Sequence, residues 1–169
     1  MKYLNTAFGQ LAFAWKLYHY GLEGKIKPGE LDADVTFHES DMFFVVPKAL
    51  GSDSDLIIAL QNNLTIAFGA AAITLNRVRE EQGIVLPNPI SSDEDQCVAL
   101  IYQVRNAFAH DIAEPRWQVF ERYRRVYEFA GRSFDLRQLN NEAFEYRHLG
   151  GPDGFYLIKD FFAEKFGIF

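Results

Sequence analysis

The stretch SDSDLIIALQNNLTIAFGAAAITLNRVREEQG, from Ser52 to Gly83, decides the fold class of this chain. The Ser and Asp residues at its start are typical helix N-caps, and a glycine such as Gly83 is typical of a helix end. Between them, apolar residues occupy nearly every side of a helix as far as Arg77. A helix that is apolar all round is a central one, and the small residues from Gly69 to Ala72 would let another helix approach closely. The stretch predicts a mainly helical protein.

The N-terminal segment has helical periodicity of its own. Residues Asn5 to Tyr20 carry apolar side chains at helical spacing, and glycines follow at positions 21 and 24. Residues 25–55 combine a Pro-Gly turn, acidic residues and a short β-prone run from Met42 to Val46. We expect loops and short elements there.

A further amphipathic helix is predicted from Ser91 to His110. Ser91 followed three residues later by Glu94 is a capping-box signature. Apolar residues recur at helical spacing along the segment and form one stripe. The stripe consists of Cys97, Ile101, Val104 and Phe108, widened by Leu100 and Ala107.

After Pro115 the pattern becomes β-prone. The runs RWQVF, RVYEF and SFDLRQL are short, aromatic and partly alternating, which favours a small β-element, although WQVFERYRRVYEFA fits a helix equally well. LGGPDG predicts a turn, and FYLIKDFFAEKF predicts a closing amphipathic helix. We therefore expect a helical bundle over residues 1–115 and a small C-terminal β-hairpin and helix extension over residues 116–169, packed together as one compact unit.

The composition narrows the class of protein. At 169 residues with 49% apolar side chains, the chain fits one domain with a sizeable core. Its net charge of -6 disfavours a broad electrostatic grip on DNA. Because Cys97 is the single cysteine, the chain has no internal disulfide and no cysteine-based zinc site. No clean signal peptide and no uninterrupted apolar run of about 18 residues is evident, so we expect a cytoplasmic protein without a membrane partner.

The end of the Ser91–His110 helix carries a polar cluster. With Val104 at the centre of the buried stripe, Arg105 falls at about 100°, Asn106 at about 200° and His110 at about 240° around the helix. Arg105 and His110 therefore bracket a polar face, with Asn106 between them. Pro115 disfavours helical geometry just before it, so the helix is expected to loosen near His110.

Such residues suit the cleavage of RNA without a metal ion. Arginine holds a phosphate with two donors, and histidine exchanges protons near neutral pH. The RNA 2′-hydroxyl is an internal nucleophile, and a second copy of the helix would add the second histidine that an in-line displacement requires. The same residues also have an ordinary structural interpretation, because arginine and histidine in a last helical turn are favoured by the helix dipole alone.

The run VRNAFAH, with Arg105, Asn106 and His110, resembles the R-x-x-x-x-H signature of the HEPN superfamily (higher eukaryotes and prokaryotes nucleotide-binding). The resemblance implies an up-and-down helical bundle. Many members are metal-independent endoribonucleases, often toxins or defence effectors, and others are inactive modules that bind RNA, nucleotides or proteins. Members usually dimerise so that two motifs share one cleft. Carried over, Arg105 and His110 are the catalytic pair and Asn106 is the polar helper.

The resemblance also suggests partners and departures. It implies RNA as substrate, a homodimer, and a cognate antitoxin or regulatory protein as a further partner, with no cofactor. One toxin branch has a tyrosine two residues after the histidine that a partner nucleotidyltransferase modifies, whereas this chain has Ile112 there. Residues from Trp117 to Phe169 lie outside the minimal bundle of the family.

Other polar clusters give weaker signals. Basic residues interleaved with aromatics in ERYRRVYEF could extend an RNA path, because bases stack on aromatic rings and phosphates bind cations. We expect weak RNA contacts from Tyr102, Arg116, Arg122 and Arg124. The group His38, Glu39 and Asp41 lies in one short loop and fits a solvated loop better than a metal site. GGPDG lacks the Lys and Ser/Thr of a phosphate loop.

Overall fold

The computed structural model describes residues 2–168 and is 55% helical, so the expected mainly helical class is confirmed. Within these residues, two small antiparallel strand pairs accompany the helices. The elements are α1 (Lys2–Leu22), α2 (Pro28–Leu31), β1 (Val35–Glu39), β2 (Met42–Val46), α3 (Asp53–Glu81), α4 (Asp93–Phe108), η1 (Glu121–Tyr123), β3 (Val126–Phe129), β4 (Arg132–Asp135), η2 (Tyr146–Leu149) and α5 (Pro152–Phe166).

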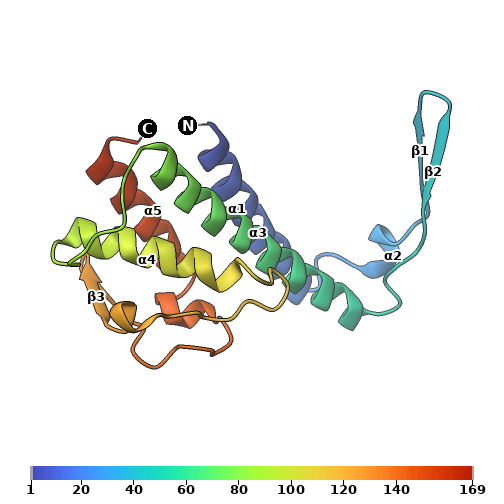
Figure 1. Cartoon of the computed structure of the whole chain (residues 1–169). Coiled ribbons are helices and arrows are strands. Elements are labelled where there is room, and N and C mark those ends of the chain that lie inside the picture. Colours follow the sequence, from blue (N-terminus) through green and yellow to red (C-terminus); the bar gives the residue numbers. More distant parts are fainter. Residues whose placement is uncertain (1, 169) are drawn as a thin grey trace.

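Helix α3 is the central helix that its sequence predicts. The Ser52 side chain accepts a hydrogen bond from the Asp55 N–H, which satisfies one of the free donors at the helix start. Along its length α3 packs against α1 and α4 (Figure 1). A Cβ atom at Gly69 would lie 2.8 Å from the Phe108 ring and 2.6 Å from the Ile112 side chain. The expected close approach at the small residues of α3 is therefore confirmed. The segment that approaches Gly69 is the end of α4 together with Ile112.

Helix α4 is covered on several sides. It contacts α3, β3 and α5. Its capping box joins Ser92 and Asp95, so the predicted pair of Ser91 and Glu94 is wrong by one residue. The shift has a physical cause, because the Asp95 carboxylate also accepts hydrogen bonds from the Ser91 N–H and hydroxyl, and these bonds hold both serines at the helix start.

The C-terminal residues form a layer over α4. In the hairpin β3–β4, Tyr127 pairs with Phe134, and both side chains are buried. The run RWQVF forms no strand; its β-type pairing is limited to the isolated bridge between Arg116 and Ala143 and the hydrogen bonds beside it. Helix α5 closes the layer, and one hydrophobic core extends from Leu4 to Ile168. Residues 1–115 and 116–169 thus contribute to the same core.

The hairpin β1–β2 is an arm that projects from the bundle (Figure 1). Its tip, at Asp41 and Met42, lies away from α5 and the rest of the bundle (Figure 1). The predicted β-prone run is confirmed as β2. Large apolar side chains are exposed along both strands, namely Val35, Phe37, Met42, Phe43, Phe44, Val45 and Val46.

By length and composition alone, α3 is apolar enough to cross a membrane, although its sequence contains no uninterrupted apolar run of about 18 residues. The same property is typical of a core helix in a folded domain. Leu64, Phe68, Ala71 and Leu75 of α3 are buried in the core, whereas Ile58, Ile66 and Ile73 are exposed.

Candidate functional site

The end of α4 is shaped by a turn that follows it. The helix ends at Phe108, and the N–H of Ala109 donates to the Asn106 carbonyl at 3.3 Å. His110 therefore lies just beyond the helix, as the loosening before Pro115 predicts. The His110 side chain is exposed, and its position is not set by the backbone geometry of α4.

The residues after His110 form a tight turn around one carboxylate. The Asp111 Oδ1 atom accepts hydrogen bonds from the N–H groups of Ala113 at 2.8 Å and Glu114 at 3.1 Å. These bonds lower the pKa of Asp111, so its carboxylate remains charged at neutral pH. The turn directs the chain back along α4.

Arg105 and Asn106 are joined to each other. The Arg105 Nη1 atom donates to the Asn106 Oδ1 atom at 3.3 Å. Arg105 is half-buried, whereas Asn106 is only 7% exposed. The polar face expected from the helical wheel is thus covered at Asn106.

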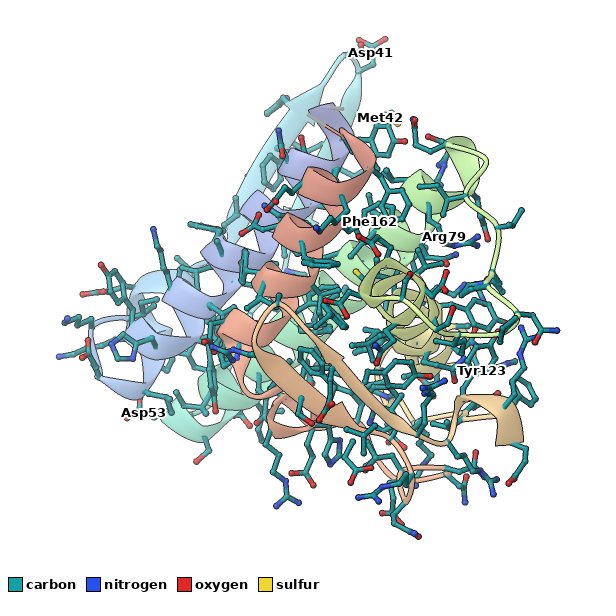
Figure 2. The ribbon with its side chains drawn as sticks, turned by 90° about the vertical axis from the view of Figure 1, so that its left-hand side faces the viewer. Asp41, Met42, Asp53, Arg79, Tyr123 and Phe162 are labelled. Carbon is teal, nitrogen blue, oxygen red and sulfur yellow. The ribbon has the colours of Figure 1, made fainter. Side chains whose placement is uncertain are left out.

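Residues 116–123, which follow the turn, contact α4 at both ends. The Arg116 N–H donates to the Ala107 carbonyl at 3.0 Å, and the Tyr123 ring lies 5.7 Å from the Tyr102 ring. Figure 2 shows Tyr123 beside α4 at the edge of the C-terminal layer. The helical wheel had left this side of the helix open to solvent.

His110 lines a small pocket that Arg116 shares. The pocket has a volume of about 180 Å³. Its lining residues are Ala107, His110, Asp111, Glu114, Arg116 and Gln118, and we call it the His110 pocket. Within residues 2–168, no protein hydrogen bond or ion pair engages the His110 imidazole. Arg105 does not line this pocket, so one chain alone does not bring the two motif side chains into one hollow.

Uncompensated arginines gather in the sequence around this site. Of the ten arginines in the chain, six form ion pairs with carboxylates in the described part, Arg124 with Glu121 among them. The four without such a partner among residues 2–168 are Arg105, Arg116, Arg122 and Arg125. Because all four fall between positions 105 and 125, positive charge remains available in this part of an otherwise acidic chain.

The predicted weak RNA contacts separate into two kinds. The Arg122 guanidinium lies 4.5 Å from the centre of the Tyr123 ring, which in turn contacts Tyr102, so these three form one cation and aromatic cluster. Arg124 instead pairs with Glu121 at 3.1 Å and is less available for a phosphate. The cluster offers an aromatic surface next to free positive charge.

A larger pocket opens beside the His110 pocket. It has a volume of about 560 Å³ and lies between α3, the turn after α4, and the segment leading into η2. Its lining residues are Gln61, Asn62, Thr65, residues 113–116 and residues 143–147, and we call it the Tyr146 pocket. Glu114 and Arg116 line both pockets, so the two hollows are neighbours. Sequence periodicity gave no signal for it, because its walls come from three separate segments.

Another histidine near the site has a structural role. The His148 Nδ1 atom accepts hydrogen bonds from the Trp117 Nε1–H at 3.0 Å and from the Glu145 N–H at 3.1 Å. Burial lowers the pKa of His148, which keeps this acceptor nitrogen unprotonated. His148 therefore holds the C-terminal layer together, in contrast to the free imidazole of His110.

Metal-ligating and thiol chemistry find little support in the described residues. No group of three or more His, Cys, Asp or Glu side chains that could hold a metal ion occurs among them. His38 lies on the exposed arm, with its ring 4.9 Å from that of Phe43. Cys97 is buried in α4, and burial raises the pKa of its thiol well above the ordinary value.

Comparison with known proteins leaves the family open. No family model, no curated protein and no solved structure matches the chain. The resemblance to the HEPN superfamily therefore depends on the residues of the motif and on their place at the end of a capped helix.

Proposed function

We propose that this protein is a metal-independent endoribonuclease of HEPN type. The observation that carries the proposal is the presence, near the end of α4, of two basic side chains without a carboxylate partner in residues 2–168. His110 is an exposed imidazole without a partner in residues 2–168, and Arg105 is a half-buried guanidinium without a carboxylate partner there. A structural role for these side chains would be expected to engage them, as it does at His148.

Each motif residue has a distinct role in this proposal. Arg105 holds the scissile phosphate, since its hydrogen bond to Asn106 leaves most of its five N–H donors available. Asn106 is a positioning residue that fixes the Arg105 guanidinium. His110 takes the proton from the RNA 2′-hydroxyl as the 2′-oxygen bonds to phosphorus and the bond from phosphorus to the 5′-oxygen breaks. A proton must reach the departing 5′-oxygen, and the products carry a 2′,3′-cyclic phosphate and a 5′-hydroxyl.

A second copy of the chain completes the site. One imidazole does not serve as base and acid on opposite sides of an in-line displacement, and Arg105 lies outside the His110 pocket of its own chain. A homodimer that places two α4 ends together supplies two imidazoles and two arginines. A protein that degrades cellular RNA also needs restraint, which points to a cognate antitoxin or another regulatory protein.

The test is RNA cleavage in the presence of EDTA. Wild type should yield 2′,3′-cyclic phosphate ends, whereas His110→Ala and Arg105→Ala should each lower the rate by about a hundredfold or more. His19→Ala and Arg137→Ala are matched controls, because both side chains are exposed and already paired with a carboxylate. Cleavage that survives either motif substitution would refute the assignment.

A binding module without catalysis is the second candidate. The observation in its favour is the same separation of Arg105 from the His110 pocket, which leaves a single chain with contacts for RNA but no assembled catalytic pair. Tight RNA binding without turnover by the wild type, with weaker binding by Arg105→Ala, would favour this function over the nuclease.

A further inference from the structure

The Tyr146 pocket has walls that are fixed before any ligand arrives. The segments 115–117 and 141–144 run side by side through a short ladder of backbone hydrogen bonds. The Trp117 N–H donates to the Glu142 carbonyl and the Phe144 N–H donates to the Pro115 carbonyl, both at 2.9 Å. Together with the Arg116 N–H bond to Ala107, this ladder holds Arg116 in place between the two pockets. A preformed site loses less conformational entropy on binding.

One wall of the pocket is an aromatic side chain with a fixed position. The Tyr146 ring lies 4.9 Å from the Trp15 ring and 5.3 Å from the Phe68 ring, so it is held by the core. Burial raises the pKa of Tyr146, and its phenol remains protonated at neutral pH. Such a ring is a suitable surface for a planar nucleobase.

The α3 side of the pocket provides free amide groups. Gln61 and Asn62 are exposed on α3, and within residues 2–168 their side-chain amides have no protein partner. Each amide has both donor and acceptor atoms, as the edge of a nucleobase requires. The aromatic wall and the amide wall face one pocket of about 560 Å³, which is within the size range of small-molecule sites.

The pocket has as many acidic as basic side chains, so its charge does not favour a simple anion such as phosphate. Glu145 is paired with Arg147, so these two neutralise each other. Glu114 and Arg116 remain, one acidic and one basic, at the boundary with the His110 pocket. A carboxylate accepts a hydrogen bond from a ribose hydroxyl, whereas a guanidinium binds a phosphate. The pair therefore matches a ribose and its phosphate together better than phosphate alone.

We propose that the Tyr146 pocket binds one nucleotide of an RNA chain, with the base in contact with Tyr146 and with the amides of Gln61 and Asn62, the ribose hydroxyl on Glu114, and the 3′-phosphate on Arg116. This inference deepens the proposed function and depends on it for one point, namely that the phosphate on Arg116 is the one presented to His110. The ribose and phosphate of the nucleotide lie on the side of the His110 pocket, because Glu114 and Arg116 line both pockets.

The test uses small probes that cannot be cleaved as RNA is. Wild type is titrated by NMR or calorimetry with the four ribonucleoside 3′-monophosphates, their 2′-deoxy counterparts and inorganic phosphate. At least one ribonucleotide should bind, about fivefold or more tightly than its deoxy counterpart and than inorganic phosphate. Arg116→Ala and Asn62→Ala should each weaken that binding by about fivefold or more, and Glu114→Gln should reduce the preference for ribose.

Matched controls lie outside the pocket. Arg137→Ala removes an exposed arginine and Asn5→Ala removes an exposed amide, and neither should change the affinity. All of the substituted side chains are exposed, so the variants should fold like wild type by circular dichroism. Absence of ribonucleotide binding, or binding unchanged in both Arg116→Ala and Asn62→Ala, would overturn the inference.

The outcomes separate this inference from the proposed function. If the protein binds ribonucleotides through Arg116 and Asn62 but does not cleave RNA, the pocket is supported as a nucleotide site and the proposed nuclease activity is overturned. A chain that cleaves RNA, with the base preference and affinity unchanged in Gln61→Ala and Asn62→Ala, would retain the nuclease and overturn the pocket.

Discussion

The two β-hairpins of this protein have similar local structures and opposite surroundings. In β3–β4, the opposed aromatics Tyr127 and Phe134 are 0% and 1% exposed. In β1–β2, the opposed aromatics Phe37 and Phe44 are 53% and 44% exposed. Strand pairing and aromatic content are alike, so the difference arises from what lies beneath each hairpin.

Tertiary packing decides which hairpin is part of the core. The hairpin β3–β4 lies against α4, and the Tyr127 hydroxyl donates to the Tyr123 carbonyl at 3.0 Å. No helix covers β1–β2 in the described structure (Figure 1). Its large apolar side chains are exposed. A two-stranded hairpin alone is marginally stable in water. The comparison predicts that the same substitution has very different costs in the two places.

The largest expected effect comes from truncating the packed aromatic. Phe134→Ala should lower the free energy of unfolding by about 3–5 kcal/mol, because it removes a fully buried ring and leaves a cavity. The matched change Phe37→Ala on the arm should alter it by less than about 0.5 kcal/mol. Denaturant titration of both variants measures the contrast.

Equal losses at both positions would contradict the comparison. They would show that the ring of Phe37 is buried in solution by a surface that a single chain does not supply. A small loss at Phe134 would instead show that β3–β4 packs only loosely on α4.

The packed side also contains a side chain, Gln103, whose burial is unfavourable. Gln103 on α4 is fully buried, and neither its Nε2 nor its Oε1 atom has a hydrogen-bond partner in the structure. Burying an unpaired amide costs about 1–3 kcal/mol. Gln103→Met, which nearly conserves volume and removes the polar atoms, should therefore raise the free energy of unfolding by about 1–2 kcal/mol. A loss of stability on thermal unfolding would reveal a hydrogen bond to Gln103 in solution.

Much of the helical framework followed from the sequence. The periodicity of residues 5–20, the central run from Ser52 to Gly83 and the closing FYLIKDFFAEKF segment all predicted helices where α1, α3 and α5 lie. These signals are local, since apolar spacing, caps and glycines act within one segment. The capping box of α4 was misplaced by one residue because Asp95 competes with Glu94 for the same role.

Non-local features could not be predicted in this way. RWQVF has β-prone composition, yet its backbone partners are distant residues such as Glu142, and only one bridge forms. Both hairpins have the same local signal, so the exposure of β1–β2 follows only from where the helices lie. The motif residues Arg105 and His110 were identified from spacing, whereas the Tyr146 pocket required the meeting of three segments.

A moderate effect is expected at the histidine that holds the packed layer. His148→Ala should lower the free energy of unfolding by about 1–3 kcal/mol at pH 7, because the Trp117 indole N–H loses its acceptor. Burial lowers the pKa of His148 in the folded state, so the unfolded chain binds this proton more readily. Stability should fall as the pH drops below the unfolded value of about 6.5 toward the lower folded value.

A variant that cannot titrate separates these two roles of His148. His148→Asn retains an acceptor near the Nδ1 position, so the decline of stability between pH 7 and pH 5 should be shallower than in wild type. Carboxylates with lowered pKa values, such as Asp95 and Asp111, are protonated only below their ordinary pKa of about 4. They therefore do not contribute to the change in stability between pH 7 and pH 5. Identical pH profiles for the two proteins would exclude His148 as the titrating group.

The smallest expected effect comes from removing the arm altogether. Val35 and Val46 are paired neighbours at its base, so a short Gly-Ser linker between Asp34 and Pro47 spans the gap. The melting temperature should change by less than a few degrees, because none of the described side chains of the arm is buried in the core. In the intact protein, the amides of β1–β2 should exchange with deuterium far faster than those of β3–β4. Slow exchange in the arm, together with a lower melting temperature after its removal, would show that another molecule covers its apolar faces and that the two hairpins differ in their partner rather than in their burial.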